Sequence, residues 1–154
     1  MRSRSMVLSL ALGLVGVILG FAQASLTGTW KLNETKSKLA SGAVKNSTVV
    51  YAVDGENVTV TIDGVGGDGK LVHTVWTGKL DGKDYAVTGD PNSDARSVTK
   101  INDHIFGFNV KNGGKSTSQG RIVVSPDGKT RTVTTTATDA KGRKISSTAV
   151  YDKE

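Results

Sequence analysis

The strongest constraint on the fold is a period-two alternation of apolar and polar residues that runs through most of the chain. It is clearest where Val58, Val60 and Ile62 alternate with Thr59 and Thr61. Successive side chains of a β-strand point to opposite faces, so this pattern predicts half-buried strands. Glycine-containing turns interrupt it at intervals of about 8–12 residues, which is the spacing of an all-β sandwich or barrel.

Many of the alternating segments end at Asp-Gly or Asn-Gly pairs, which favour tight hairpins. We expect strands at 26–32, 47–53, 57–63, 70–80, 84–88, 95–101, 104–111, 116–125, 129–138 and 144–152. The segment 33–44 loses the alternation and is expected to form a bridging loop or one helical turn. The loop 89–94 is the most irregular turn, and it is expected to mark either a barrel rim or a gap between neighbouring strands.

The connections between these segments are short, which leaves no room for a parallel crossover. Consecutive strands should therefore be antiparallel neighbours. An open meander of this many twisted strands would expose two edges, and pairing the first strand with the last removes both. We predict an all-β fold, a single antiparallel up-and-down meander barrel of about 8–10 strands. A Greek-key sandwich would need longer connections.

The beginning of the sequence resembles a secretory leader. Arg2 and Arg4 precede an apolar run, and the small-x-small pattern Ala22-Gln23-Ala24 follows it. We expect a signal peptide at 1–24, a barrel domain at 25–154, and a periplasmic or secreted protein with no integral membrane contact after cleavage. A retained membrane anchor is the alternative, because the run approaches the ~18 apolar residues of a span. The chain has no cysteine to form a disulfide or to carry a lipid anchor.

The charge of the chain argues against a nucleic-acid partner. The formal net charge is +6, or +4 without Arg2 and Arg4, and the basic residues are spread singly through turns and strands. A nucleic-acid interface needs clustered basic residues, whereas scattered lysines keep strand edges and surfaces soluble. We expect a monomer that binds no nucleic acid.

The Gly28-Thr29-Trp30 sequence on the first strand, followed by a meander that ends near Tyr151, resembles the lipocalin and fatty-acid-binding (calycin) superfamily. The chain is most similar to the small exported bacterial lipocalin-like proteins. The resemblance implies that Gly28 lets the first strand bend and that Trp30 plugs the closed end of the barrel. It also implies a basic partner for Trp30 from a late strand, either Arg131 or Arg143. The last strand lacks the Arg-x-Tyr sequence by which fatty-acid carriers hold a carboxylate.

A shortage of bulky side chains favours a hollow interior. The chain has two Trp, three Tyr and three Phe, and one Phe falls in the leader. Protein interiors reach a packing density of about 0.74, which threonine and valine alone fill poorly in a barrel of this size. The residues expected to contact a ligand are Trp76, Tyr51, Phe106, Phe108 and Arg131. Ordinary core packing is the alternative role for the aromatic residues.

Three arginines lie within or near the expected strands, namely Arg96, Arg121 and Arg131. An arginine inside a barrel is costly unless it meets an anion, so an inward one would indicate a carboxylate or phosphate ligand. Strand parity places Arg121 with Val123, and Arg131 with Val133, on faces that carry apolar residues. The alternative is that each arginine points outward into solvent.

The sequence offers little chemistry for catalysis or metal binding. It contains no nucleophile elbow, zinc-protease or phosphate-loop motif, and His73 and His104 make a poor metal site. Asp90, Asn92 and Asp94 open like a calcium loop, but the residue types required later in such a loop are missing. We therefore expect no cofactor, no metal and no enzyme activity. A cavity isomerase or hydratase that uses Tyr and His is the enzymatic alternative.

These observations predict an exported, non-enzymatic barrel that binds a small, mostly apolar ligand in its interior. The alternative is an envelope or secreted interaction or inhibitor module with a filled barrel, which would work through an outer face or through the loop 89–94.

Overall fold

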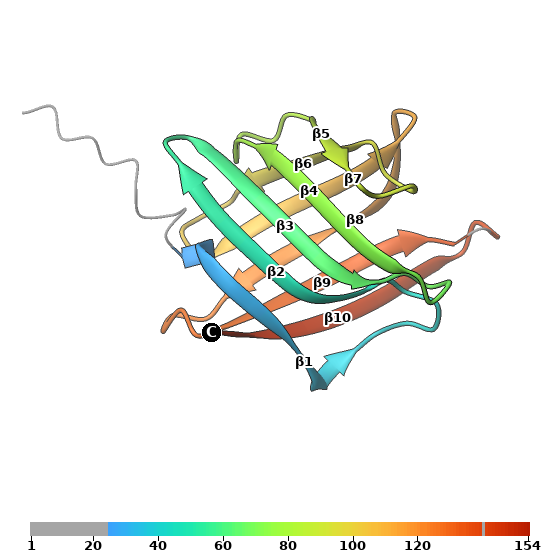
Figure 1. Ribbon diagram of the computed structural model, residues 1–154, viewed down its shortest axis with the longest axis horizontal. Helices are drawn as coiled ribbons and strands as arrows, with labels where there is room; N and C mark the ends of the chain where they lie inside the picture. Colours follow the sequence, from blue (N-terminus) through green and yellow to red (C-terminus); the bar gives the residue numbers. More distant parts are fainter. Residues whose placement is uncertain (1–24, 140) are drawn as a thin grey trace, which may run out of the picture.

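The alternating segments form ten strands, each antiparallel to the next (Figure 1). The computed structural model describes residues 25–139 and 141–154. The strands are β1 (Gly28–Lys38), β2 (Lys45–Asp54), β3 (Asn57–Val65), β4 (Leu71–Gly78), β5 (Tyr85–Thr88), β6 (Ala95–Lys100), β7 (Ile105–Asn112), β8 (Lys115–Val124), β9 (Thr130–Thr138) and β10 (Lys144–Lys153). The predicted strands are confirmed to within a few residues at each end, except that β1 is longer than expected.

The first and last strands pair with each other and close the barrel. In the β1–β10 ladder, Trp30 lies opposite Lys153 and Leu32 lies opposite Tyr151. The order of strands around the barrel is therefore the order of the sequence, and the predicted meander barrel is confirmed. Closure pairs strands that would otherwise be the two edges of the sheet.

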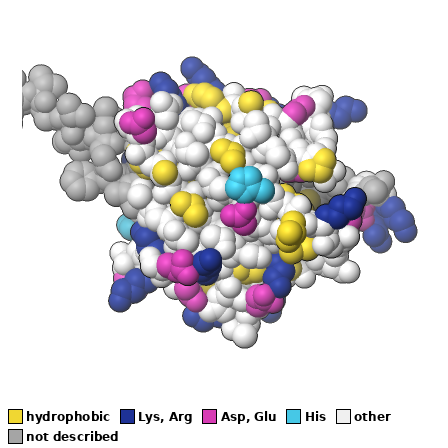
Figure 2. All heavy atoms as spheres, in the orientation of Figure 1, with side chains coloured by type: hydrophobic (Ala, Val, Ile, Leu, Met, Phe, Trp, Pro, Cys, Tyr) yellow, Lys and Arg dark blue, Asp and Glu magenta, His cyan; other side chains and the backbone are white. Residues whose placement is uncertain are grey.

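The alternation divides the side chains between an apolar interior and a mostly polar outer surface. On β3, Val58, Val60 and Ile62 are buried, whereas Thr59 and Thr61 face outward. Figure 2 shows one outer face on which basic and acidic side chains are interspersed and hydrophobic ones are scattered. This face carries no large region of one charge.

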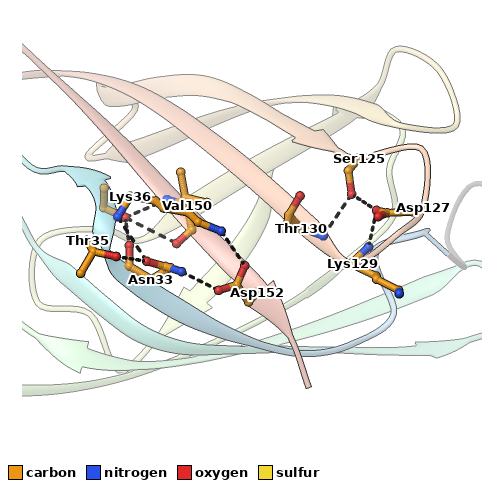
Figure 3. A network of polar contacts seen from close by, with 10 residues as sticks. Asn33, Thr35, Lys36, Ser125, Asp127, Lys129, Thr130, Val150 and Asp152 are labelled. Carbon is orange, nitrogen blue, oxygen red and sulfur yellow. Dashed lines mark hydrogen bonds and ion pairs between the residues drawn. The ribbon is translucent and has the colours of Figure 1, made fainter.

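The prediction for residues 33–38 was wrong, because β1 continues to Lys38 with a shifted register after Asn33. Side chains replace the missing ladder hydrogen bonds in this segment. The Ser37 hydroxyl accepts a bond from the Val150 N–H at 2.9 Å and donates to the Asn33 carbonyl at 2.7 Å. The Asn33 amide donates to the Asp152 carboxylate at 2.6 Å (Figure 3). Polar residues that bond in this way hold a strand in place without any alternation.

Gly28 and Trp30 fix the start of β1. Gly28 has a φ of 119°, which side-chain-bearing residues rarely adopt, and a Cβ there would lie 2.8 Å from the Cε atom of Lys153. Two residues later, the Trp30 side chain is fully buried, and its indole N–H donates to the Leu26 carbonyl at 2.7 Å. Gly28 therefore allows a bend that brings the indole under the chain that precedes the strand.

One end of the barrel interior is filled by apolar side chains, which we call the plug. The plug consists of Leu26, Trp30, Val58, Val60, Val98, Phe106 and Val124, each at most 4 % exposed. The segment before β1 lies against this end of the barrel, where the Ser25 hydroxyl donates to the Asp103 carbonyl at 2.7 Å. Full burial of a large apolar side chain stabilises a fold by about 1.5–3 kcal/mol, so the plug is a principal source of stability.

The expected signal peptide, residues 1–24, lies outside the described residues. Within the part of the chain that the structure describes, no helix is both long enough and apolar enough to cross a membrane.

Candidate ligand-binding cavity

Beyond the plug, the barrel interior holds a cavity of about 1080 Å³. It extends from the plug to a rim formed by the connections β1–β2, β3–β4, β5–β6 and β9–β10. The loop 89–94 belongs to this rim, which is one of the two roles expected for it. Pockets for small molecules usually measure about 300–1,000 Å³, so the cavity can hold an organic molecule of that size.

The cavity wall is mainly apolar and is contributed by all parts of the sheet. The larger apolar side chains that line it include Val49, Ile62, Trp76, Val87, Phe108, Val110, Ile122 and Val133. The Trp76 ring is held by two contacts. Its indole N–H donates to the Arg96 carbonyl at 2.9 Å, and the Tyr85 ring packs edge-on against it with ring centres 6.1 Å apart. These contacts fix the orientation of the largest aromatic surface in the wall.

Four of the five residues expected to contact a ligand line the cavity, namely Trp76, Tyr51, Phe108 and Arg131. Phe106 does not, because it is fully buried in the plug. Phe106 and Phe108 share a face of β7, but Phe106 lies two residues nearer the closed end. Strand parity predicts which face a side chain occupies, whereas its depth in the barrel depends on register.

Arg131 lies among three aromatic rings next to the plug. It is only 3 % exposed, and its guanidinium carbon lies 5.4 Å from the ring centre of Trp30, 5.1 Å from that of Tyr51 and 4.4 Å from that of Tyr151. Each such cation–π contact contributes about 0.5–2 kcal/mol. Of the two basic partners that the resemblance implied for Trp30, Arg131 occupies this position, and Arg143 lies in the exposed β9–β10 turn.

Arg96 enters the same cavity from β6 and stacks over Phe108, with its guanidinium carbon 5.2 Å from the ring centre. Burial lowers the pKa of Arg96, the Tyr51 hydroxyl opposes this shift, and the positive charge of Arg131 adds to it. The two positive charges therefore repel each other. Arg96 was not among the residues expected to contact a ligand. Arg96 lies two residues before the buried Val98 on the same strand, so both side chains point to the same face of the sheet. This spacing is the sequence signal that indicates an inward-facing Arg96.

Within residues 25–139 and 141–154, neither arginine has a counter-ion. The Nε of Arg96 and the Nε and Nη1 of Arg131 are buried without a hydrogen-bond partner. None of the ion pairs among the described residues includes either arginine. The acidic residues of the cavity wall are Asp68, Asp90 and Asp139, which lie at the rim and bond within their own turns. The wall therefore carries positive charge that no carboxylate of the described chain neutralises.

The hydroxyl of Tyr151 adds a hydrogen-bond donor near Arg131. Burial raises the pKa of Tyr151, although the charge of Arg131 opposes the shift. The phenol is therefore protonated at neutral pH. Tyr51, which also lines the cavity and is 5 % exposed, has its ring on the same guanidinium.

The histidines lie away from the cavity. His73 is exposed on the outer face of β4 and contacts Asp63 at 2.6 Å, and His104 is exposed in the β6–β7 turn. The hypothesis of a cavity enzyme needed one of them inside, so their positions do not support it. In the rim loop, the Asp90 carboxylate accepts bonds from the Asn92 N–H and the Ser93 hydroxyl, as in an ordinary turn. Residues 25–139 and 141–154 contain no group of three or more His, Cys, Asp or Glu side chains suited to a metal ion.

Comparison with models of protein families gives no match, and neither does comparison with curated proteins. Among solved structures, the chain is similar to a redesigned β-barrel, mFAP1, bound to DFHBI. The TM-score is 0.45 at 15 % identity, over 86 % of this chain and 99 % of that one. It is also similar to EF1p2_mFAP2b bound to DFHBI, with a TM-score of 0.48 at 10 % identity, over 87 % of this chain and 98 % of that one.

Proposed function

We propose that this protein is an exported, non-enzymatic carrier that binds a small, mostly apolar molecule inside its barrel. The observation that carries the proposal is the cavity of about 1080 Å³, which opens at the rim and has a mainly apolar wall. The non-enzymatic part of the proposal is supported by His73 and His104, which the enzymatic alternative needs inside the barrel and which are exposed outside the cavity. Export is supported by the leader-like sequence at 1–24.

The proposal includes kinship with the lipocalin-like barrels. It is supported by Gly28-Thr29-Trp30 at the start of β1 and by the position of Arg131 over the Trp30 ring. A ligand would displace water from the apolar wall, which favours binding by about 25 cal/mol per Å² of apolar surface buried. Because the barrel is closed by hydrogen bonds all the way round, the wall is formed before the ligand arrives, and this lowers the cost of binding.

The test is binding of the neutral apolar probe N-phenyl-1-naphthylamine, measured by the rise of its own fluorescence. Thr135 and Thr134 are neighbours on β9, and only Thr135 lines the cavity, while Thr134 is exposed on the outer face. The variant Thr135→Trp fills part of the cavity and should weaken probe binding by about tenfold or more. The matched control Thr134→Trp adds the same side chain outside and should bind the probe like the unmodified protein.

Two results would refute the carrier role. The first is a folded, unmodified protein that gives no saturable rise in probe fluorescence. The second is equal weakening by Thr135→Trp and Thr134→Trp, because binding would then depend on general stability or on the outer surface.

A further inference from the structure

The outer surface of the barrel carries a groove of about 460 Å³ that crosses the strands β6, β7, β8 and β9. We propose that this groove is a second binding site and that it takes an acidic glycan, with a sugar carboxylate on Arg121 and a sugar ring over Gly107. The proposal is independent of the carrier role, because the side chains it uses point away from the cavity.

One row of residues in the groove crosses all four strands. Gly107 of β7 lies opposite Thr99 of β6 on one side and opposite Arg121 of β8 on the other. Arg121 in turn lies opposite Thr134 of β9, and all four residues line the groove. Neighbouring strands lie about 4.8 Å apart, so the row spans about 14 Å. Because Gly107 has no side chain, its backbone is open to a ligand between Thr99 and Arg121.

The packing of the barrel does not require a glycine at position 107. Its φ is not left-handed, and a Cβ there would meet nothing closer than the Cδ1 atom of Ile101 at 3.8 Å. The register shift between β7 and β8 lies beyond Val110, so it does not account for the residue. A glycine inside a strand marks a bulge, a tight bend, or the close approach of a ligand or another backbone. Of these, the open space above Gly107 favours a ligand.

Arg121 places a positive charge beside this glycine. Its side chain is exposed and takes part in none of the ion pairs among residues 25–139 and 141–154. The four strands contain no Asp and no Glu, so none of their side chains would repel an anion in the groove. The planar fork of a guanidinium matches the two oxygens of a carboxylate. The ligand should therefore carry a carboxylate.

A second row of residues provides hydroxyl and amide groups, which match the hydroxyls of a sugar. Asn109 lies opposite Ser97 and Gln119, and Gln119 lies opposite Thr136. These four residues also line the groove. Side-chain amides and hydroxyls both donate and accept hydrogen bonds, as sugar hydroxyls do. The Asn109 side-chain oxygen accepts a bond from the Ser116 hydroxyl at 2.6 Å, which fixes the orientation of this amide.

The same side chains fit a nucleic acid poorly. Proteins bind nucleic acids through clustered basic residues, and they bind single strands through aromatic rings on which the bases stack. The outward-facing side chains that line the groove include one basic residue and no aromatic ring. An acidic glycan needs neither feature.

The experiment measures the binding of two acidic oligosaccharides, hexagalacturonate and hexamannuronate, to the full chain by isothermal titration calorimetry. Each is compared with its methyl ester, which keeps the sugar chain and removes the charge. We expect at least one acidic oligosaccharide to bind saturably, and about 10- to 100-fold more tightly than its ester.

Two variants with matched controls test whether binding takes place in the groove. Arg121→Gln should lower the affinity by about tenfold or more, whereas Lys129→Gln removes the same charge from the exposed β8–β9 turn and should leave it unchanged. Gly107→Thr adds a side chain to the groove and should also lower the affinity by about tenfold or more. Its urea midpoint should be at least that of the unmodified protein, because threonine favours strands. Ala52→Thr makes a similar addition on the exposed face of β2 and should leave the affinity unchanged.

The proposal is overturned if neither acidic oligosaccharide binds, if the esters bind as tightly as the acids, or if Gly107→Thr binds like the unmodified protein. Equal weakening by Arg121→Gln and Lys129→Gln would overturn it too, because binding would then follow net charge alone. An oligothymidylate of similar length that binds as tightly as the oligosaccharides would assign the groove to nucleic acid instead. N-phenyl-1-naphthylamine reports on the cavity separately, so each of these results leaves the carrier role standing.

Discussion

At the level of single residues, Trp30 connects the first strand to the plug. Its side chain is fully buried, and its indole N–H donates to the Leu26 carbonyl at 2.7 Å. The variant Trp30→Phe leaves a void and removes the donor from a buried carbonyl, so we expect a loss of about 2–4 kcal/mol in the free energy of unfolding. Urea unfolding followed by circular dichroism measures this loss.

The control for this variant is Leu71→Ala, which truncates an apolar side chain that is 90 % exposed. Its free energy of unfolding should stay within about 0.5 kcal/mol of the unmodified value. A Trp30→Phe protein as stable as this control would contradict the role assigned to the indole. Since the chain has only two tryptophans, Trp30→Phe also leaves Trp76 as the sole tryptophan reporter, in the cavity wall.

At the level of the strands, Gly120 controls how β8 packs beneath Phe108. A Cβ at Gly120 would lie 2.0 Å from the Thr134 carbonyl oxygen of β9 and 2.8 Å from the Cζ atom of Phe108. Gly120→Ala must therefore move both the backbone between β8 and β9 and the Phe108 ring of the cavity wall. We expect a loss of about 1–3 kcal/mol in the free energy of unfolding, measured in urea.

Gly107 on the neighbouring strand β7 provides the comparison. A Cβ at Gly107 would meet nothing closer than 3.8 Å, and the residue does not have a left-handed φ. Gly107→Ala should leave the stability unchanged or raise it by about 0.4–1 kcal/mol, because it restricts the unfolded chain. Equal effects of the two alanine substitutions would show that close packing at Gly120 is unimportant.

At the level of the whole molecule, stability depends on closure between β1 and β10. Removing residues 144–154 deletes β10 and leaves β1 and β9 as open edges. It also removes Tyr151 from the surroundings of Arg131 and opens the cavity wall. We expect the truncated chain to lose its cooperative urea transition and its near-ultraviolet circular dichroism, and to aggregate through the exposed edges.

Glu154→Gln is the control, because it changes only an exposed side chain beyond the end of β10 and keeps the backbone N–H that donates to the Thr29 carbonyl at 3.0 Å. That protein should unfold at nearly the same urea concentration as the full chain. A cooperative transition in the chain that lacks residues 144–154 would show that the barrel does not depend on its last strand.

The sequence alone predicts most of the architecture, because alternation and turn chemistry are local properties. Val58, Val60 and Ile62 specify one face of a strand whatever surrounds them. Asp54-Gly55 specifies a hairpin in the same local way. Short connections then restrict the strands to a meander, and the hazard of two open edges favours closure. Each of these inferences needs only neighbours in the sequence.

The tertiary structure alone decided which features form the site. The 33–38 segment is a strand because Ser37 bonds to Val150, a partner 113 residues away. Phe108 lines the cavity while Phe106 fills the plug, since depth in a barrel follows from the register of all its strands. The alternation along their strands placed both Arg121 and Arg131 on faces that carry apolar residues. Of the two, only Arg131 faces inward. Whether a barrel interior is hollow, and which charges meet inside it, depends on side chains brought together from distant strands.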